Sequence, residues 1–235
     1  MNNTNKPSHA PAKLRILVVG ATRGTGRATV EQLLAEGHHV TAFSRSAHAL
    51  DLESPRMTLC SGDAMNPADV ERAVARHDAV VVTLGITENP LRVRLLGPAR
   101  TPIDVRSRGT DNVIAAMRKH GVRRLVVQTT YGVGSTRDQL GWMDRLFFSL
   151  LLEPQIADTE IQNEAVLHSD LDWVIAQPVH LTDDTDAPMP FLSTSGETGT
   201  MKVSRSSVAR FLAQAATTPG YVRRSVAVSG AEVAR

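Results

Sequence analysis

The sequence has very little cysteine and few aromatic residues: Cys60 is the only cysteine among 235 residues, and there are two tyrosines and two tryptophans. A single cysteine cannot form an internal disulfide, and such sparse use suits a reducing cytoplasm. No group of cysteines and histidines has the spacing of metal ligands, so we expect no bound metal. With two tyrosines, the chain also has few phenolic proton donors.

Long basic and long apolar runs are absent as well. The formal net charge is only +2, and consecutive basic residues occur at most in pairs, such as Arg123-Arg124 and Arg223-Arg224. The charge therefore gives no indication of a nucleic-acid partner. The longest strongly apolar run, 146–152, is too short to span a bilayer. These absences predict a soluble, cytoplasmic protein that binds neither nucleic acid nor a membrane.

The first residues differ in composition from the rest. Residues 1–12 are polar, contain Pro7 and Pro11, and lack the apolar core of a signal peptide, so we expect a disordered tail. The remaining chain, 13–235, has a length common for one α/β domain. With 42% hydrophobic residues overall, the chain can bury one substantial core. We predict a single domain with small substrate-side elements towards its C-terminal end.

Short apolar runs alternate with segments of helical periodicity along this domain. Strands are predicted at 14–19, 39–43, 57–60, 79–84, 124–131, 171–176, 202–204 and 225–229. Helices are predicted at 27–36, 67–74, 103–120, 157–168 and 205–216. The alternation predicts an α/β fold with a doubly wound parallel sheet, right-handed crossovers and helices on both faces.

The best-defined motif is the glycine turn Gly20-Ala21-Thr22-Arg23-Gly24-Thr25-Gly26, which joins the strand 14–19 to the following helix. The first glycine permits a tight turn, the second lets the backbone approach a pyrophosphate, and the third lets the helix pack on the strand. The helix N-terminus offers unpaired N–H groups and a positive dipole to phosphates. In this context the glycine spacing predicts a Rossmann-like dinucleotide-binding domain.

The end of the second strand bears on which dinucleotide is bound. The strand runs into Ser44-Arg45-Ser46, and no acidic residue follows until Asp51. An acid here would bind the ribose hydroxyls of NAD, whereas an arginine accommodates the 2′-phosphate of NADP. Arg45 and its two serines suit a phosphate clamp, and Arg23 could reach the same phosphate. We therefore predict NADP(H) as the cofactor.

Other strand ends and two irregular segments complete the expected site. Asp63 follows the third strand and could bind either the adenine amino group or its own loop backbone. The fourth strand ends at Gly85, where a side chain would obstruct the cofactor. The segment 86–102 is expected to be a long loop over the site, and 135–153 a lid or packing helix. The apolar face near Phe147 suits a lid or a dimer contact, so monomer and homodimer both stay open.

These patterns together resemble the atypical short-chain dehydrogenases/reductases, and more narrowly their NAD(P)H-binding, NmrA-like branch, which includes flavin reductases. The residues that carry the resemblance are the glycine turn, Gly62-Asp63, 78–85, 109–117 and 171–175 before Pro178. The likeness covers nearly everything from Leu14 to Gly230. It is specific for the family and not for a substrate.

The resemblance implies a nicotinamide between the ends of the fourth, fifth and sixth strands. The residues matched to the family's nucleotide-binding positions are Gly20, Thr22, Arg23, Gly24, Thr25 and Gly26 at the diphosphate, Arg45 at the 2′-phosphate, Asp63 at the adenine, and Leu84 and Gly85 at the ribose. Those matched to positions beside the nicotinamide are Thr129, Thr130, Pro178, Val179 and His180.

The chain departs from the usual catalytic pattern of short-chain reductases. Their Tyr-x-x-x-Lys pair lowers the pKa of a phenol so that it can exchange a proton. Neither Tyr131 nor Tyr221 is followed by such a lysine. Many relatives carry a lysine where this chain has Glu160, and we expect that carboxylate to face solvent. The sequence excludes catalysis by a Tyr/Lys pair.

Hydride transfer to a flat conjugated acceptor such as a flavin, quinone or tetrapyrrole needs orientation more than a strong acid. Thr130 or Tyr131 could hydrogen-bond the acceptor, and His180 could relay a proton; core packing of Tyr131 and a loop role for His180 stay open. The sequence thus favours an NADPH-dependent reductase of a small conjugated molecule. The alternative is a non-catalytic NADP(H)-sensing regulatory protein. A sugar-nucleotide epimerase fits poorly, because those relatives rely on Tyr-x-x-x-Lys.

Overall fold

A computed structural model describes residues 12–86, 101–139, 153–184 and 188–231 of the chain. Its strands are β1 (Arg15–Val19), β2 (His39–Ser44), β3 (Met57–Ser61), β4 (Ala79–Val82), β5 (Arg124–Gln128), β6 (Asp172–Pro178), β7 (His180–Thr182), β8 (Phe191–Ser193), β9 (Lys202–Ser204) and β10 (Arg224–Ser229). Its α-helices are α1 (Gly24–Ala35), α2 (Pro67–Val74), α4 (Val105–His120), α6 (Glu153–Leu167) and α7 (Arg205–Thr217). Two short 3₁₀ helices, η1 (Ala47–Ala49) and η2 (Gly134–Gln139), complete the described elements.

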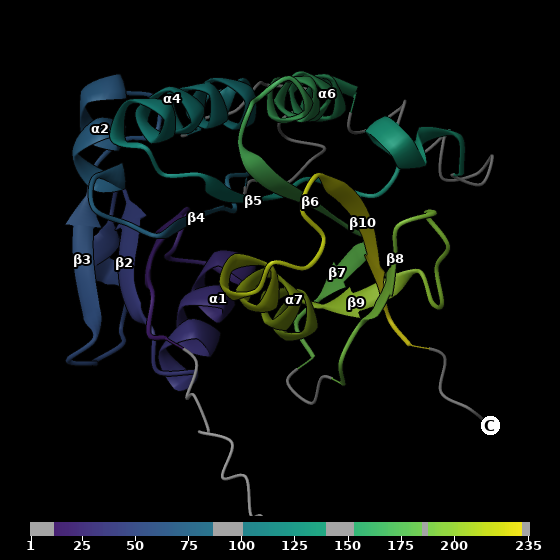
Figure 1. Cartoon of the computed structure of the whole chain (residues 1–235). Coiled ribbons are helices and arrows are strands. Elements are labelled where there is room, and N and C mark those ends of the chain that lie inside the picture. The colour runs from purple at the N-terminus through teal and green to yellow at the C-terminus, as the bar shows by residue number, and fades with distance from the viewer. Residues whose placement is uncertain (1–11, 87–100, 140–152, 185–187, 232–235) are drawn as a thin grey trace, which may run out of the picture.

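The described strands form one large sheet and one small one (Figure 1). The large sheet has eight strands in the order β3-β2-β1-β4-β5-β6-β10-β8, and β7 pairs with β9 in a separate two-stranded sheet. Every neighbouring pair in the large sheet is parallel except β10 and β8. The order reverses between β1 and β4, where open α/β sheets bind their ligands. The predicted doubly wound, Rossmann-like fold is confirmed.

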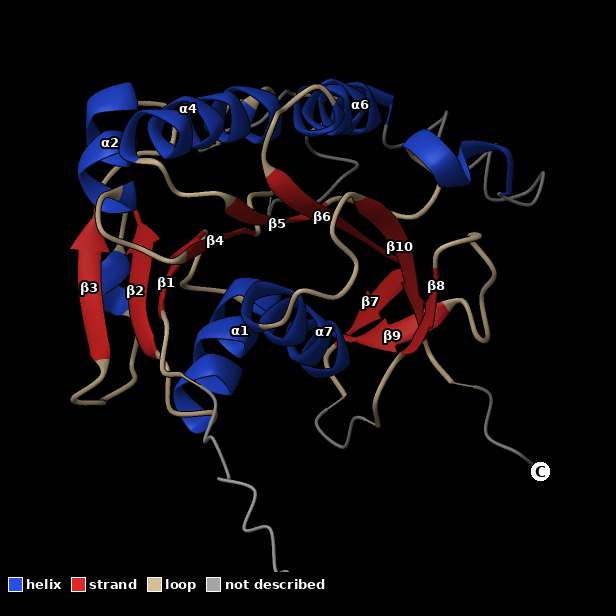
Figure 2. Cartoon of the chain, in the orientation of Figure 1, coloured by secondary structure: helices blue, strands red, loops and turns tan. Residues whose placement is uncertain are grey.

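Helices cover both faces of the large sheet, as predicted. Figure 2 shows α2, α4 and α6 on one face and α1 and α7 on the other. Successive side chains of β1 point to opposite faces of the sheet. Ile16 and Val18 belong to the core under α1 and α7, while Leu17 and Val19 belong to the core under α4. A strand buried on both faces needs such a continuous apolar run. The first strand is thereby fixed in the centre of the molecule, with the glycine turn at its end.

The predicted start of the helix 67–74 and the predicted end of the helix 103–120 both have local capping residues. The side chain of Asn66 caps α2 by accepting a hydrogen bond from the Ala68 N–H at 3.0 Å, and Pro67 occupies the first helical position. At the C-terminal end of α4, Gly121 adopts the left-handed conformation with φ of 70°. These local signals are independent of tertiary contacts, which explains why the sequence alone places both helix ends.

Several predicted boundaries were wrong. The ladder of β4 ends at Val82 and that of β5 at Gln128, earlier than predicted, while β6 continues to Pro178. The strands β7 and β8 lie between the predicted strands 171–176 and 202–204, where no strand was predicted. Each of the two is only three residues long and partly exposed, so neither has the apolar alternation that marks a strand.

Some predictions concern parts of the chain that the structure does not cover. Nearly all of the expected tail 1–12 and of the loop 86–102, and the central part of the segment 135–153, lie outside the described residues. The single domain 13–235 therefore stays a prediction. Within the described ranges, no helix is both long and apolar enough to cross a membrane.

Candidate functional site

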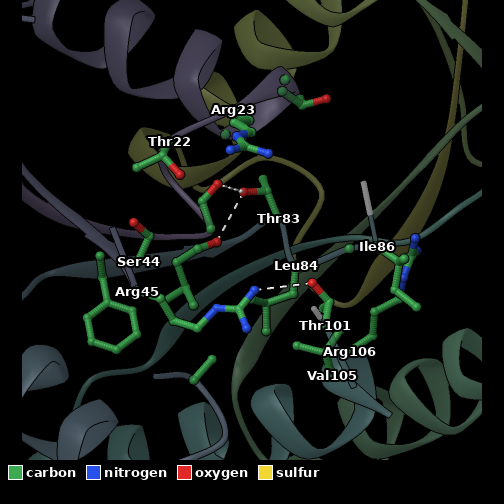
Figure 3. Close-up of a pocket in the computed structure, with 18 of the residues that line it drawn as sticks. Thr22, Arg23, Ser44, Arg45, Thr83, Leu84, Ile86, Thr101, Val105 and Arg106 are labelled. Atoms are coloured by element: carbon green, nitrogen blue, oxygen red, sulfur yellow. Dashed lines mark hydrogen bonds between the residues drawn. The ribbon is translucent and has the colours of Figure 1, made fainter. Parts of the chain in front are cut away.

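A cleft of about 790 Å³ lies at the carboxyl ends of the central strands (Figure 3). Its wall is built from the loops that follow β1, β2, β3 and β4, from the last residue of β5, and from the first turns of α4 and α7. The described lining residues include four arginines and one carboxylate, and no lysine, histidine, tyrosine or cysteine. Four guanidinium groups around one cavity favour a ligand with several negative charges.

The glycine turn is held against the end of β4. Gly20 has a φ of +90°, and a Cβ there would lie 2.8 Å from the carbonyl oxygen of Thr83. A Cβ on Gly26 would collide with the carbonyl oxygen of Gly20 and lie 2.6 Å from the hydroxyl oxygen of Thr83. The hydroxyl of Thr83 in turn lies 3.0 Å from the Val19 carbonyl oxygen, to which it donates. Glycines are thus required here by space and not only by backbone conformation.

Helix α1 begins inside the wall of the cleft. Its N-cap residue is Arg23, whose side chain makes no capping hydrogen bond, and the helix starts at Gly24. The amide N–H groups of a first helical turn have no partner within the helix. Together with the positive end of the helix dipole, they are suited to binding a phosphate.

The end of β2 supplies the second group of polar residues. Arg45 is exposed and donates from Nη2 to the hydroxyl of Thr101 at 3.1 Å. The hydroxyl oxygen of Ser44 is buried and has no hydrogen-bond partner among the described residues. Both residues line the cleft, as does Arg23. Figure 3 shows Arg23 and Arg45 on different sides of the cavity, with Ser44 near Arg45.

The structure brings together most residues matched to nucleotide-binding positions. Those that line the cleft are Gly20, Thr22, Arg23, Gly24, Thr25, Gly26, Arg45, Asp63, Leu84 and Gly85. Asp63 also organises its own loop: its carboxylate accepts the Met65 N–H at 3.0 Å. The individual roles of these residues stay predictions, but their positions share one cavity.

The residues predicted on the nicotinamide side do not line the described cleft. Thr129 and Tyr131 are buried at 2% and 5% exposure. The hydroxyl of Thr130 lies 3.4 Å from the Tyr131 carbonyl oxygen. Pro178 and Val179 are buried, and His180 is exposed at the start of β7. Their predicted roles therefore find no support in the shape of this cavity.

The phenol of Tyr131 already has a protein partner. It donates to the Gly196 carbonyl at 2.9 Å, and burial raises the pKa of Tyr131. A raised pKa makes the phenol a weaker acid, opposite to the effect that a neighbouring lysine has in Tyr/Lys enzymes. This geometry favours the interpretation of Tyr131 as a core residue.

We expect Tyr131→Phe to lower the free energy of unfolding by about 1 kcal/mol, because the buried Gly196 carbonyl loses its donor. The dissociation constant of NADPH should not change. Urea denaturation and a fluorescence titration measure the two quantities. Tyr221→Phe is the matched control, since the Tyr221 ring packs edge-on against Phe211 and its hydroxyl makes no hydrogen bond to described residues. A higher dissociation constant of NADPH in Tyr131→Phe would contradict this interpretation and indicate that Tyr131 contributes to cofactor binding.

The expectation that Glu160 faces solvent was wrong. Its side chain is 18% exposed and forms an ion pair with Arg137. Its second carboxylate oxygen accepts the N–H of Gly134 at 3.2 Å. No sequence pattern indicates this partner, because Arg137 lies in η2, a short 3₁₀ helix without a regular pattern. Glu160 thus joins α6 to the segment after β5.

Several polar residues of the cleft were not among the predicted site residues. Thr83 and Gln128 lie at the ends of β4 and β5, and Arg106 and Arg205 open α4 and α7. Arg205 packs against the glycine turn, since a Cβ on Gly24 would lie 3.4 Å from its Nε, and it donates to Asp183 at 2.6 Å. Only the fold places the start of α7 beside the start of α1, so no local signal could have identified Arg205.

Comparisons with known proteins agree with this geometry. A family model described as NAD(P)H-binding matches residues 20–219. A 2-alkyl-3-oxoalkanoate reductase of Stenotrophomonas maltophilia is 37% identical over 120 residues, 51% of this chain and 34% of that protein. Cinnamoyl-CoA reductase 1 of Oryza sativa is 33% identical over 140 residues, 56% of this chain and 37% of that protein. The chain thus matches about a third of the length of these curated relatives.

Solved structures share the fold over nearly the whole chain. ChuY of Escherichia coli O157:H7, described as an anaerobilin reductase, has a TM-score of 0.74 and 21% identity, covering 94% of this chain and 99% of that one. A short-chain dehydrogenase/reductase of Veillonella parvula in complex with NADP has a TM-score of 0.70 and 17% identity, covering 92% and 94%. At these identities the likeness shows the fold alone.

Proposed function

The chain belongs to the NAD(P)H-binding family, and from this membership we propose that it is an NADPH-dependent reductase that transfers a hydride to a flat conjugated acceptor. The proposed acceptor is a flavin, a quinone or a tetrapyrrole. The observation that carries the proposal is the cleft at the strand ends, which four arginines line and in whose wall α1 begins without a side-chain cap. Such a cavity suits a dinucleotide with an additional phosphate.

The positions of the residues support the cofactor-binding roles that we propose for them. The first turn of α1 and the glycine turn would hold the diphosphate, and Arg45 with Ser44 would hold the 2′-phosphate. Gly85 leaves room for the ribose at the end of β4. When bound, the reduced nicotinamide supplies the hydride. The residues of this chain bind and orient the two reactants and exclude water between them.

The proposed class of acceptor follows from the scarcity of proton-donating side chains among the described residues of the cleft. Asp63 is the single proton-donating candidate among its described lining residues, and it is engaged with its own loop. Carbonyl reduction by the usual route needs a phenol and a lysine, whereas reduction of a conjugated ring system can take its proton from water. The names of the curated relatives support an NAD(P)H-dependent reductase in general, and the name of ChuY, an anaerobilin reductase, agrees with a conjugated acceptor.

The proposal is tested by following NADPH absorbance with purified protein and a panel of FMN, riboflavin, menadione and biliverdin. We expect oxidation of NADPH with at least one acceptor and slower oxidation of NADH at equal concentration. The alternative, a non-catalytic NADP(H) sensor, is favoured by the same lack of acids in the described cleft. NADPH binding without turnover across the whole panel would refute the reductase and support the sensor.

A further inference from the structure

Arg106 lies in the cleft away from the arginines of the glycine turn and β2. It is the second residue of α4, and a Cβ on Gly85 would lie 3.3 Å from its Nη2, so the guanidinium packs against the end of β4. In Figure 3 the guanidinium of Arg45 reaches Thr101, and Arg106 extends from there towards Ile86. This is the end of the cleft that faces β4 and β5, not the end at β1 and β2.

The guanidinium of Arg106 makes no hydrogen bond to any described residue. The residue is half-buried in the wall of the cleft. Burial lowers the pKa of Arg106, and the nearby Asp158 opposes this effect. A guanidinium has five N–H donors, and burying part of it without an acceptor is costly. A half-buried positive charge that lines a cavity and has no hydrogen-bond acceptor indicates an anionic ligand.

Asp158 lies near this charge but makes no hydrogen bond with the guanidinium, because its oxygens accept hydrogen bonds from other groups. They accept the backbone N–H groups of Arg106 at 3.0 Å and Ser107 at 3.2 Å, and also the hydroxyl of Ser107. These bonds fix the start of α4 and therefore the Cα position of Arg106. The Asp158 carboxylate thus positions the backbone of Arg106 but makes its hydrogen bonds with groups other than the guanidinium.

Gln128 is a second unsatisfied group in the same cleft. Its Oε1 is buried and has no hydrogen-bond partner in the described structure. The register pairs Val127 with Val82, which brings Gln128 level with Thr83, two residues before Gly85. Its amide Nε2 can donate to an anionic oxygen, and its Oε1 can accept from an N–H of the same ligand. An arginine and an amide at adjacent strand ends are suited to a polar group on a ring system.

We propose that Arg106 binds an anionic oxygen group, a carboxylate or a phosphate, of the hydride acceptor, with Gln128 as its neighbour. The inference rests on the proposed function and narrows its substrate class to acidic conjugated acceptors. The cofactor's phosphates are accounted for by the glycine turn and Arg45, whereas a nicotinamide ring carries no negative charge for Arg106 to bind. Guanidinium pairs with carboxylate or phosphate bidentately, which would orient the ring as well as hold it.

Pairs of acceptors with the same ring system and different charge test the assignment. Biliverdin is compared with its dimethyl ester, which probes a carboxylate, and FMN with riboflavin, which probes a phosphate. We expect the wild-type protein to favour the acidic member of at least one pair. Arg106→Gln should raise the KM of that acceptor by about tenfold or more, with the neutral member and the dissociation constant of NADPH unchanged. Arg106→Lys should restore part of the preference.

Arg108→Gln is the matched control, because Arg108 is exposed on the same helix and pairs with Asp104 at 3.2 Å. Thermal melts establish that both variants fold. An unchanged acid-to-neutral ratio in Arg106→Gln would overturn the proposal, and so would an equal loss of NADPH affinity, which would assign Arg106 to the cofactor.

A binding experiment distinguishes an error in the proposed reductase activity from an error in the proposed role of Arg106. Binding of the same acceptor pairs to the NADP⁺-bound protein is measured by fluorescence quenching, without any turnover. If no acceptor is reduced but the acidic members bind more tightly and lose that advantage in Arg106→Gln, the reductase is refuted and the anion site stands. If acceptors are reduced and bound without regard to charge, the anion site is refuted and the reductase stands.

Discussion

Gly26→Ala is expected to weaken NADPH binding by about a hundredfold or more, which corresponds to about 2.7 kcal/mol. The new Cβ would collide with the Gly20 carbonyl oxygen and lie 2.6 Å from the Thr83 hydroxyl, so α1 must move away from the glycine turn. The first-turn N–H groups would then leave their positions at the diphosphate, and each bond to a charged group is worth about 1.5–3 kcal/mol. A fluorescence titration with NADPH measures the loss.

The same change should lower the free energy of unfolding by about 1–3 kcal/mol, because extra volume is forced into a packed contact. Gly220→Ala is the control: its nearest neighbour to a new Cβ is the Thr218 hydroxyl at 3.6 Å, and its φ is not positive. That variant should bind NADPH and unfold like the wild-type protein. Wild-type affinity in Gly26→Ala would contradict the assignment of the glycine turn to the cofactor.

The clash explains why the glycine turn could be predicted from the sequence. Its residues are contiguous and follow a strand buried on both faces, Gly20 and Gly24 have positive φ, and a Cβ on Gly26 would collide with Gly20 in the same turn. Strand-end residues such as Asp63 and Gly85 could be placed for a similar reason, because parallel strands deliver their carboxyl ends to one edge. The chemistry of this half of the cleft is therefore largely encoded in short segments.

The other half of the cleft depends on tertiary structure. The run from Arg124 to Tyr131 has the composition of one strand, but the ladder ends at Gln128. Prediction therefore emphasised Thr129 and Tyr131, which the fold buries, and missed Gln128, which faces the cavity. Strand propensity does not reveal where pairing stops, because threonine and tyrosine also favour strands.

Arg106 and Arg205 illustrate a second limit. Each begins a helix whose own pattern is polar on one face, where an arginine is ordinarily a solvated surface residue. Only the packing of α4 beside β4, and of α7 beside α1, turns these side chains towards a common cavity. Such convergence of distant helix ends has no signature within any short window of sequence.

Arg45→Ala is expected to raise the dissociation constant of NADPH by about tenfold or more and to leave that of NADH nearly unchanged. A charge-assisted bond to the 2′-phosphate is worth about 1.5–3 kcal/mol, and NADH lacks that phosphate. The Arg45 side chain is placed by its bond to Thr101, so the ligand meets an oriented guanidinium. Titrations with both nucleotides at two ionic strengths measure the selectivity, which should shrink as salt screens this exposed charge.

Arg27→Ala is the matched control for this selectivity. Arg27 is on α1, forms an ion pair with Glu31 at 2.9 Å, and is not among the residues that line the cleft. Its removal should not alter the preference between the two nucleotides. Equal losses for NADPH and NADH in Arg45→Ala would show that the arginine binds a group common to both. The buried Ser44 hydroxyl, which has no partner among the described residues, would then be the next candidate for the 2′-phosphate.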